Sequence, residues 1–486
     1  MTRAHFTVSI GVVGLLMVGC AGVLPHGLTA EAPVPAAPES TVELTPPAPP
    51  EPTQPSIPER LLTPDATLTL ADIVEIALRN NPLTRESYFR ALAARAQLGI
   101  DRAPYYPTVD FDINAARTSQ SVIGGQFNFS QTTYGPEMTL DYLVFDLGGR
   151  AADAESSRLA VLAADWTHTA VVQNVILGVQ QTFVEYLNAR AQLDAAKSNL
   201  KTAQTAFDSA SVRKQAGVAT IADVLQAQTA MSQAQLAVDR LSGEVHALRG
   251  ALATAMGLPA TTPYDVGELP AELPLDFASK AVEDLIAQAQ VVRPDLAAAR
   301  LEAERADVKI KSARSAGLPS LVASADANRS YYQPSTFSKY GDSWSVRLGL
   351  RIPIFTGFDV KNRVQKAKDD AEVAVAQADS LEQQVILQVW TSYYGLQTAT
   401  QLVKTSRDLL KSAEQSERVA LGRYQEGVGT IIDLLTAQAA LADARAQEIL
   451  ARSSWFYALA QLAHDVGVAS PTLQAAVSVT EEGRGQ

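Results

Sequence analysis

The chain contains an internal duplication, which requires two similar halves rather than unrelated domains. The segments Gln215–Gln228 (QAGVATIADVLQAQ) and Gln425–Gln438 (QEGVGTIIDLLTAQ) lie 210 residues apart and share nine of their 14 residues. Matching residues nearer the start of each half lie 212 positions apart, so the two halves differ slightly in length. A hairpin loop absorbs such a difference at little cost. We therefore predict two structural repeats, residues 67–266 and 267–470.

Each half contains two stretches in which apolar and polar residues alternate, the pattern of a β-strand with one apolar face. The clearest stretch runs from Trp344 to Ile352, and its apolar residues occupy every second position. The other three predicted strands lie near residues 109–115, 138–142 and 321–326. Strands of about ten residues cross a bilayer when they are tilted. Ordinary sandwich hairpins show the same alternation, so it does not identify a membrane strand by itself.

Two polar segments, Ser119–Thr133 and Asn328–Asp342, separate the predicted strands of each half, and tyrosines accompany them. Polar segments beside aromatic residues are typical of the outer loops of a membrane barrel. Four strands cannot close a barrel, and an open sheet edge does not persist in lipid. Because single-chain barrels start at about eight strands, the four strands must combine with strands of other subunits.

Each half continues into a very long predicted helix and then a return helix. The long segments contain no proline and are rich in residues that favour helices. At about 1.5 Å per residue they extend on the order of 100 Å, more than a compact core needs. An exposed coiled coil and a helical wall with water on both faces are the two interpretations, and polar residues on more than one face favour the wall. We predict long helices at 150–215 and 361–425, return helices at 220–256 and 430–466, and shorter helices at 70–78, 85–99, 282–289 and 296–315.

The first 19 residues have the order of an export signal. Arg3 precedes an almost continuously apolar run from Val8 to Val18, and a small residue then precedes Cys20. The segment resembles a bacterial lipoprotein signal, which implies cleavage before Cys20 and a covalent lipid on its thiol. Ala21 follows the cysteine, and by the same resemblance the anchor is directed to the outer membrane. An ordinary buried cysteine in an uncleaved apolar segment is the alternative.

The residues that follow the cysteine predict an extended tether. Eleven of the 25 prolines lie in residues 31–64, a composition that forbids helix and favours polyproline II. We therefore predict a lipidated, Pro-rich tether over residues 20–66, with a Pro-rich recognition tract as the alternative. At the other end of the chain, residues 471–486 are predicted to form a flexible tail.

Composition and charge argue against several classes of function. The net charge is −12 and the sequence has no basic cluster, so a nucleic-acid partner is not expected. Cys20 is the only cysteine, which leaves no intrachain disulfide and no thiolate metal cluster. The Walker A, HExxH and GxSxG patterns are absent, and the five histidines are scattered. We therefore predict that the chain is not an enzyme and has no catalytic residues, no metal site and no cofactor apart from the covalent lipid.

Three motifs follow one another along the chain. They are YLVFDLGGR at 142–150, RIPIFTG at 351–357 and RYQEGVGTIIDLLTAQ at 423–438. Their order and spacing resemble those of the TolC-type outer-membrane efflux family. The resemblance implies an α+β membrane protein and a homotrimer, in which long helices form a periplasmic α-helical barrel and each chain contributes four strands to a 12-stranded transmembrane β-barrel. It also implies outer-membrane lipid, a periplasmic adaptor (membrane fusion) protein and an inner-membrane pump as partners.

The resemblance further assigns roles at the tips of the helical hairpins. Asp433 matches a pore-facing aspartate of a periplasmic gate, Asp223 matches a carboxylate at the companion tip, and Tyr424 is its cross-hairpin hydrogen-bond partner. Capping of the following helix is the alternative role of both aspartates. Glycine between two long helices allows the chain to reverse. The helix-tip turns, which by resemblance also meet the adaptor, contain Gly217, Val218, Gly427 and Val428.

Taken with the resemblance, these features imply a trimeric outer-membrane channel with a large periplasmic portion. The channel provides the passive exit duct of a tripartite efflux system and is gated at its periplasmic helix tips. Carboxylates around a narrow mouth attract cations and discourage anions. The alternatives are the outer-membrane channel of a type I protein secretion system and a periplasmic coiled-coil lipoprotein scaffold that does not insert.

Overall fold

The computed structural model describes residues 67–468, apart from residues 123, 125–126, 268–272, 274–280 and 335–337. The predicted signal at 1–19, Cys20, the tether at 20–66 and the tail at 471–486 lie outside the described residues. All described residues belong to one compact unit.

The two halves contain the same elements in the same order. The first half contains α1 (Leu70–Asn80), α2 (Pro82–Arg102), β2 (Thr108–Val122), β3 (Phe127–Phe145), α3 (Gly149–Gln215) and α4 (Ile221–Ala255). The second half contains α5 (Val282–Val292), α6 (Pro294–Ser315), β5 (Ser320–Gln333), β6 (Tyr340–Arg351), α7 (Asp359–Gln425) and α8 (Ile431–Asp465). Both long helices have 67 residues, and both return helices have 35. The equal lengths agree with the duplication in the sequence and show two structural repeats.

Three short elements were not foreseen from the sequence. The strands β1 (Thr67–Leu68) and β4 (Asp265–Val266) pair in parallel and connect the start of the first half with its end. A single turn of 3-10 helix, Ala103–Tyr105, lies between α2 and β2. Strands of two residues have too few side chains to show a period, so hydrophobic patterning does not detect them.

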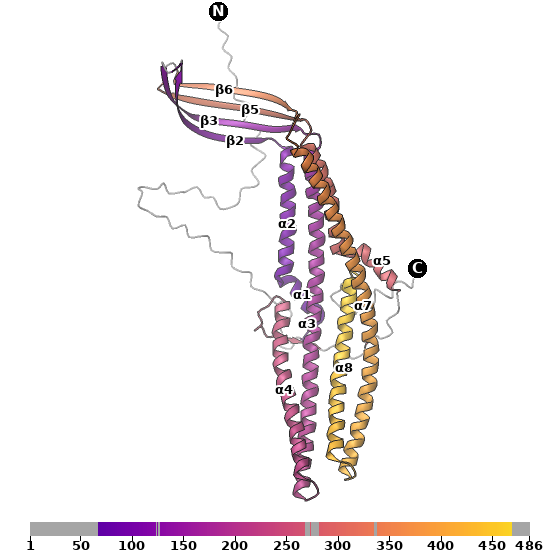
Figure 1. Ribbon diagram of the computed structural model, residues 1–486. Helices are drawn as coiled ribbons and strands as arrows, with labels where there is room; N and C mark the ends of the chain where they lie inside the picture. Colours follow the sequence, from indigo (N-terminus) through magenta and orange to yellow (C-terminus); the bar gives the residue numbers. More distant parts are fainter. Residues whose placement is uncertain are drawn as a thin grey trace, which may run out of the picture. The chain divides into compact units, whose positions relative to one another are not determined.

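The long helices pack as two antiparallel hairpins, α3 with α4 and α7 with α8 (Figure 1). Their shared core includes Trp455 of α8, which is completely buried, together with Val385 and Val389 of α7 and Val179 of α3. Alanine occupies many of the other contact positions along the hairpins, as at Ala210. Small side chains let two helices approach closely along their whole length. This close packing stabilises the long helices of each hairpin. Among the described residues, no helix combines the length and the apolar character that crossing a bilayer requires.

The four long strands form one antiparallel sheet in the order β2-β3-β5-β6 (Figure 1). Cross-strand pairing gives this sheet two chemically different faces. One row across all four strands contains Val109, Leu140, Ala325 and Val346. The adjacent row on the opposite face contains Asp110, Thr139, Asp326 and Ser345. The apolar face is open in the single chain, and Val109, Val346 and Trp344 are 58%, 71% and 78% exposed.

The expectation of two long outer loops is wrong. The strand β2 continues to Val122 and β3 begins at Phe127, so most of the segment Ser119–Thr133 pairs within the sheet. In the second half, β5 continues to Gln333 and β6 begins at Tyr340. Backbone N–H and C=O groups pair regardless of the side chains, so a strand that is polar on both faces shows no period in the sequence.

Candidate functional site

The two hairpin tips have the same backbone geometry. Gly217 and Gly427 each have φ of 75°, the left-handed conformation in which a side chain would be strained. The next residue donates its N–H back across the turn, from Val218 to the Arg213 carbonyl at 2.9 Å and from Val428 to the Arg423 carbonyl at 3.0 Å. This pattern ends each long helix and reverses the chain within a few residues.

The aspartates that follow the turns cap the return helices. In the first tip, Asp223 accepts hydrogen bonds from the Thr220 N–H at 2.7 Å and from the Thr220 hydroxyl at 2.9 Å. In the second tip, Asp433 accepts from the Thr430 N–H at 3.2 Å, and the Thr430 hydroxyl accepts from the Asp433 N–H at 3.1 Å. Both pairs form a reciprocal capping box. The capping role that the sequence left open is therefore present at both aspartates.

The local bonds also set the charge state of the second aspartate. The backbone N–H of Thr430, followed by its hydroxyl and the positive charge of Arg423, lowers the pKa of Asp433 below its ordinary value of 3.8. Asp433 is exposed, so its carboxylate is available to solutes as well as to the helix.

One contact joins the two tips and was not predicted. Arg213, in the last turn of α3, donates a hydrogen bond at 2.9 Å to the carbonyl oxygen of Tyr424 in the last turn of α7. The Arg213 guanidinium carbon also lies 4.7 Å from the centre of the Tyr424 ring, a cation–π contact. The family resemblance implied a cross-hairpin bond between Tyr424 and Asp223, whereas the hydrogen bonds that the structure gives Asp223 are with Thr220.

Alignment of the two halves of the sequence gives the one indication of this contact. Arg213 corresponds to Arg423, whereas Lys214 corresponds to Tyr424, so the repeats conserve the arginine and differ in the neighbouring residue. Read alone, however, neither half shows that an arginine of one tip reaches an aromatic ring of the other.

The tips also differ in how well they are packed. Tyr424, Ile431 and Leu434 form a small buried cluster in the second tip. In the first tip, Ile221 corresponds to Ile431 but is 56% exposed, and Leu225 is 54% exposed. The turn valines Val218 and Val428 are 67% and 69% exposed, and apolar side chains of this kind are available to a partner.

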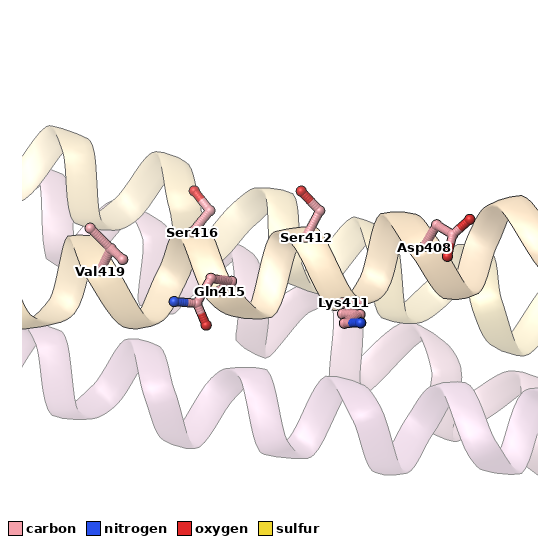
Figure 2. Close-up of a pocket in the computed structure, with 6 residues that line it drawn as sticks. All are labelled: Asp408, Lys411, Ser412, Gln415, Ser416 and Val419. Carbon is pink, nitrogen blue, oxygen red and sulfur yellow. The ribbon is translucent and has the colours of Figure 1, made fainter.

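A shallow groove of about 500 Å³ lies along α7, before the helix reaches its tip. Six residues of this helix line it, and Figure 2 shows the Ser412 and Ser416 side chains projecting on the same side of the ribbon. The groove contains one acidic and one basic residue, Asp408 and Lys411. Within the described part of the chain, no group of three or more His, Cys, Asp or Glu side chains is placed to hold a metal ion.

Comparison with known proteins identifies relatives over most of the chain. Protein CyaE of Bordetella pertussis is 29% identical over 385 residues, which are 79% of this chain and 80% of the relative. The pyoverdine export outer membrane protein OpmQ of Pseudomonas putida is 26% identical over 406 residues, covering 79% and 82% of the two chains. A crystal structure of a membrane protein from Pseudomonas aeruginosa matches with a TM-score of 0.74 and 25% identity, and the match covers 82% of this chain and 93% of that chain.

The family comparison follows the duplication. Residues 73–258 and 285–468 match the sequence profile described as Outer membrane efflux protein. Each matched segment contains one long helical hairpin with the two strands that precede it. Because the two segments make up well over half of the 486 residues, the chain belongs to the outer membrane efflux protein family.

Proposed function

We propose that the chain forms a homotrimeric outer-membrane channel that acts as the passive exit duct of a tripartite efflux system. The observation that carries this proposal is the four-stranded sheet, which has one exposed apolar face, one polar face and two edges that pair with no described strand. In water, such a face would be an aggregation hazard. In a bilayer, it contacts lipid while the opposite face lines an aqueous pore.

The strand order supports closure by pooled strands. The edges of the sheet are β2 and β6, and successive neighbours are antiparallel, so β2 and β6 run in opposite directions. An edge β6 that pairs with β2 of the next copy therefore continues the antiparallel pattern without interruption. Closure in this way removes every free edge, which a lipid environment demands. Three copies give the twelve strands that the family resemblance implies.

The helices support the same arrangement. Asn199 and Thr202 of α3 lie against α8, where Arg445 donates to the Asn199 side chain at 3.1 Å and Thr202 shares a cavity with α8 residues. The matching residues of α7, 210 positions later, are Leu409 and Ser412, and both are exposed. Within the described part of the chain, these two positions of α7 thus lack the neighbour that α3 has. In a ring, α4 of the next copy occupies this place, because α4 is the counterpart of α8.

The hairpin tips serve as the gate in this proposal. Symmetry places three copies of Asp433 around one axis, where their charges repel one another and attract cations. Asp223 and Tyr424 lie at the same end and complete the constriction. The exposed valines Val218 and Val428 contact the periplasmic adaptor, which connects the duct to an inner-membrane pump.

The family and the sequence support the proposed localisation. We place the channel in the outer membrane with its helices in the periplasm, and we place a covalent lipid on Cys20 as a second anchor. One relative carries the name of a pyoverdine export protein, which supports export as the class of function. Choice of cargo rests with the pump in such an assembly, and the chain itself needs no cofactor or catalytic residue.

Purification of the full chain in mild detergent tests the proposal. We expect particles with three times the mass of the protein, resistance of these trimers to dissociation on warming, and discrete ion-conducting steps in planar bilayers. A monomer that retains its β-structure signal and conducts no ions would refute the proposal and favour a scaffold that does not insert.

A further inference from the structure

The two edges of the sheet carry complementary charges on its polar face. The edge strand β2 has Asp110 and Asp112 on this face and no basic residue, whereas the edge strand β6 has Arg347 and Arg351 and no acidic residue. A guanidinium nitrogen of Arg347 lies 3.8 Å from a carboxylate oxygen of Asp326 in β5. In the described part of the chain, the side chains of Asp112 and Arg351 have no hydrogen-bond or ion-pair partner, and both are exposed.

The two hairpins of the sheet have the same register at their base. Thr108 of β2 pairs with Asp141 of β3, and Ser320 of β5 pairs with Arg351 of β6. The strand β5 therefore repeats β2 at an offset of 212 residues, and β6 repeats β3 at an offset of 210 residues. These are the offsets that the duplication shows in the sequence, so each residue of one hairpin has a known counterpart in the other.

This correspondence predicts how β6 of one copy pairs with β2 of the next copy, a junction that we call the seam. The seam is the counterpart of the pairing between β3 and β5 within the chain. There, Asp141 lies directly opposite Ser324. The counterpart of Asp141 is Arg351, and the counterpart of Ser324 is Asp112. At the seam, Arg351 of one copy therefore lies directly opposite Asp112 of the next copy.

The same register continues the apolar face across the seam. Leu140 lies opposite Ala325 within the chain, and the counterparts of these residues are Leu350 and Ile113. Leu350 and Ile113 are 63% and 76% exposed in the single chain. Placed opposite each other, they extend the apolar surface from one copy to the next without a gap.

The apolar face alone does not determine the register of the seam. A slip of one residue would turn every side chain of a strand to the wrong face, so the two faces exclude it. A slip of two residues keeps both faces and moves Arg351 to a position opposite Asp110 or Asn114 of the next copy. Only the side chains that face one another distinguish these registers.

We infer that Arg351 of one copy and Asp112 of the next form an ion pair on the polar face and thereby fix the register in which the copies close. The inference rests on the proposed trimeric channel and names the contact that aligns its copies. Opposite charges directly across antiparallel strands stabilise the pairing, and like charges destabilise it. Because an exposed ion pair contributes little energy, this pair selects the register and does not supply the main stability of the trimer.

Reversal of the two charges, one at a time and together, tests the ion pair. Asp112→Arg and Arg351→Asp each place like charges opposite one another at every seam, and we expect each to lower the yield of heat-resistant trimers roughly tenfold. The double variant restores opposite charges and should recover most of the yield. Gln120→Arg is the matched control, because it adds an arginine to the polar face of β2 where the predicted register places Ser343. This control should leave the yield unchanged.

Disulfide formation between copies tests the register itself. One full chain carries Arg351→Cys with Asp112→Cys, and a comparison chain carries Arg351→Cys with Asp110→Cys. Directly opposite residues lie about 5 Å apart, whereas diagonal neighbours lie about 7–8 Å apart, too far for a disulfide. We expect oxidation to link copies efficiently only in the first chain, as dimers and trimers on non-reducing gels. The strands β2 and β6 are opposite edges of one sheet, so this bond does not form within a chain. Chains with one added cysteine measure the background from Cys20.

The outcomes separate the inference from the proposed function. Efficient crosslinking through Asp110→Cys would overturn the register, as would trimers that crosslink in neither chain. A double reversal that yields no more trimers than the single reversals would overturn the ion pair. Failure of the proposed function gives a different result, because the unchanged chain then forms no trimers.

Discussion

The indole N–H of Trp455 in α8 donates a hydrogen bond at 3.0 Å to the hydroxyl of Thr400 in α7. The Trp455 ring is completely buried and packs edge-to-face against Phe456. This polar contact fixes the register of the second hairpin at a point inside its apolar core. A tryptophan buried in this way needs a partner for its N–H, and Thr400 supplies it.

Removal of either partner should destabilise the second hairpin. We expect Thr400→Val to lower the free energy of unfolding by about 1–3 kcal/mol, because a buried N–H loses its acceptor. Trp455→Ala should cost about 3–5 kcal/mol through lost packing. Thr398→Val is the control, since Thr398 is exposed on the same helix and should change the value by less than about 0.5 kcal/mol. Thermal melting of the detergent-solubilised protein, followed by circular dichroism, checks all three, and equal melting temperatures would contradict the role of the bond.

A charge on the apolar face of the sheet should prevent assembly in the membrane. Val346→Lys places an ammonium group at the lipid surface, which costs about 2–4 kcal/mol for each copy near the bilayer centre. We expect loss of heat-resistant trimers from the outer-membrane fraction. Thr139→Lys is the matched control, because Thr139 lies on the polar face between Asp110 and Asp326, where a positive charge is accommodated. Equal tolerance of both lysines would show that neither face meets lipid.

Neutralisation of the proposed gate should change ion selectivity. Asp433→Ala removes three charges from the constriction, and we expect a higher single-channel conductance with a weaker preference for cations. Reversal potentials under a salt gradient measure the preference. Asp239→Ala removes another exposed aspartate, from α4 outside the tips, and should leave both quantities unchanged. A full cation preference in the Asp433 variant would place the selective charges elsewhere.

The same carboxylate predicts the pH range of that selectivity. Hydrogen bonds from Thr430 and the charge of Arg423 lower the pKa of Asp433 below 3.8. A carboxyl with a lowered folded pKa contributes its capping stability in full above its unfolded pKa and loses it as the pH falls through the folded value. We therefore expect cation preference to persist at pH 5 and to decline only under more acidic conditions. Reversal potentials measured at pH 7, pH 5 and pH 3 check this, with Asp433→Asn as the variant that should show no such decline.

The proposed covalent lipid on Cys20 has a direct mass test. Intact mass spectrometry of the membrane-extracted chain should show loss of residues 1–19 and gain of acyl mass. We expect Cys20→Ser to abolish both changes, because the thiol is the attachment point. Trimers should still assemble in the variant, since the sheet provides the larger anchor. An unmodified cysteine in the mature chain would exclude the lipid.

The sequence predicted the helical hairpins closely because helix ends carry chemical signals. Thr220 and Thr430 were expected to start the return helices, and the structure places both as N-caps. Gly217 and Gly427 lie at the turns that the sequence proposed for them. Caps and glycines act through the local backbone, so a single sequence reveals them.

Features that depend on contacts between distant residues were harder to predict from the sequence. Strands β2 and β5 extend beyond their predicted ends because polar residues pair through the backbone without a visible period. The contact between Arg213 and Tyr424 joins residues 211 positions apart, and no local pattern reports it. The alternation of apolar and polar residues nonetheless predicted the two faces of the sheet, because residues two positions apart share a face in every strand.

The matched lengths of the two hairpins restrict which insertions and deletions the long helices tolerate. Deletion of one residue from α7 alone would draw its end back by about 1.5 Å and rotate it by about 100°, which separates Tyr424 from Arg213. A compensating deletion in α3 would restore the alignment. Insertions and deletions in these helices are therefore tolerated only in corresponding pairs, and the two repeats are free to diverge in their side chains but not in their span.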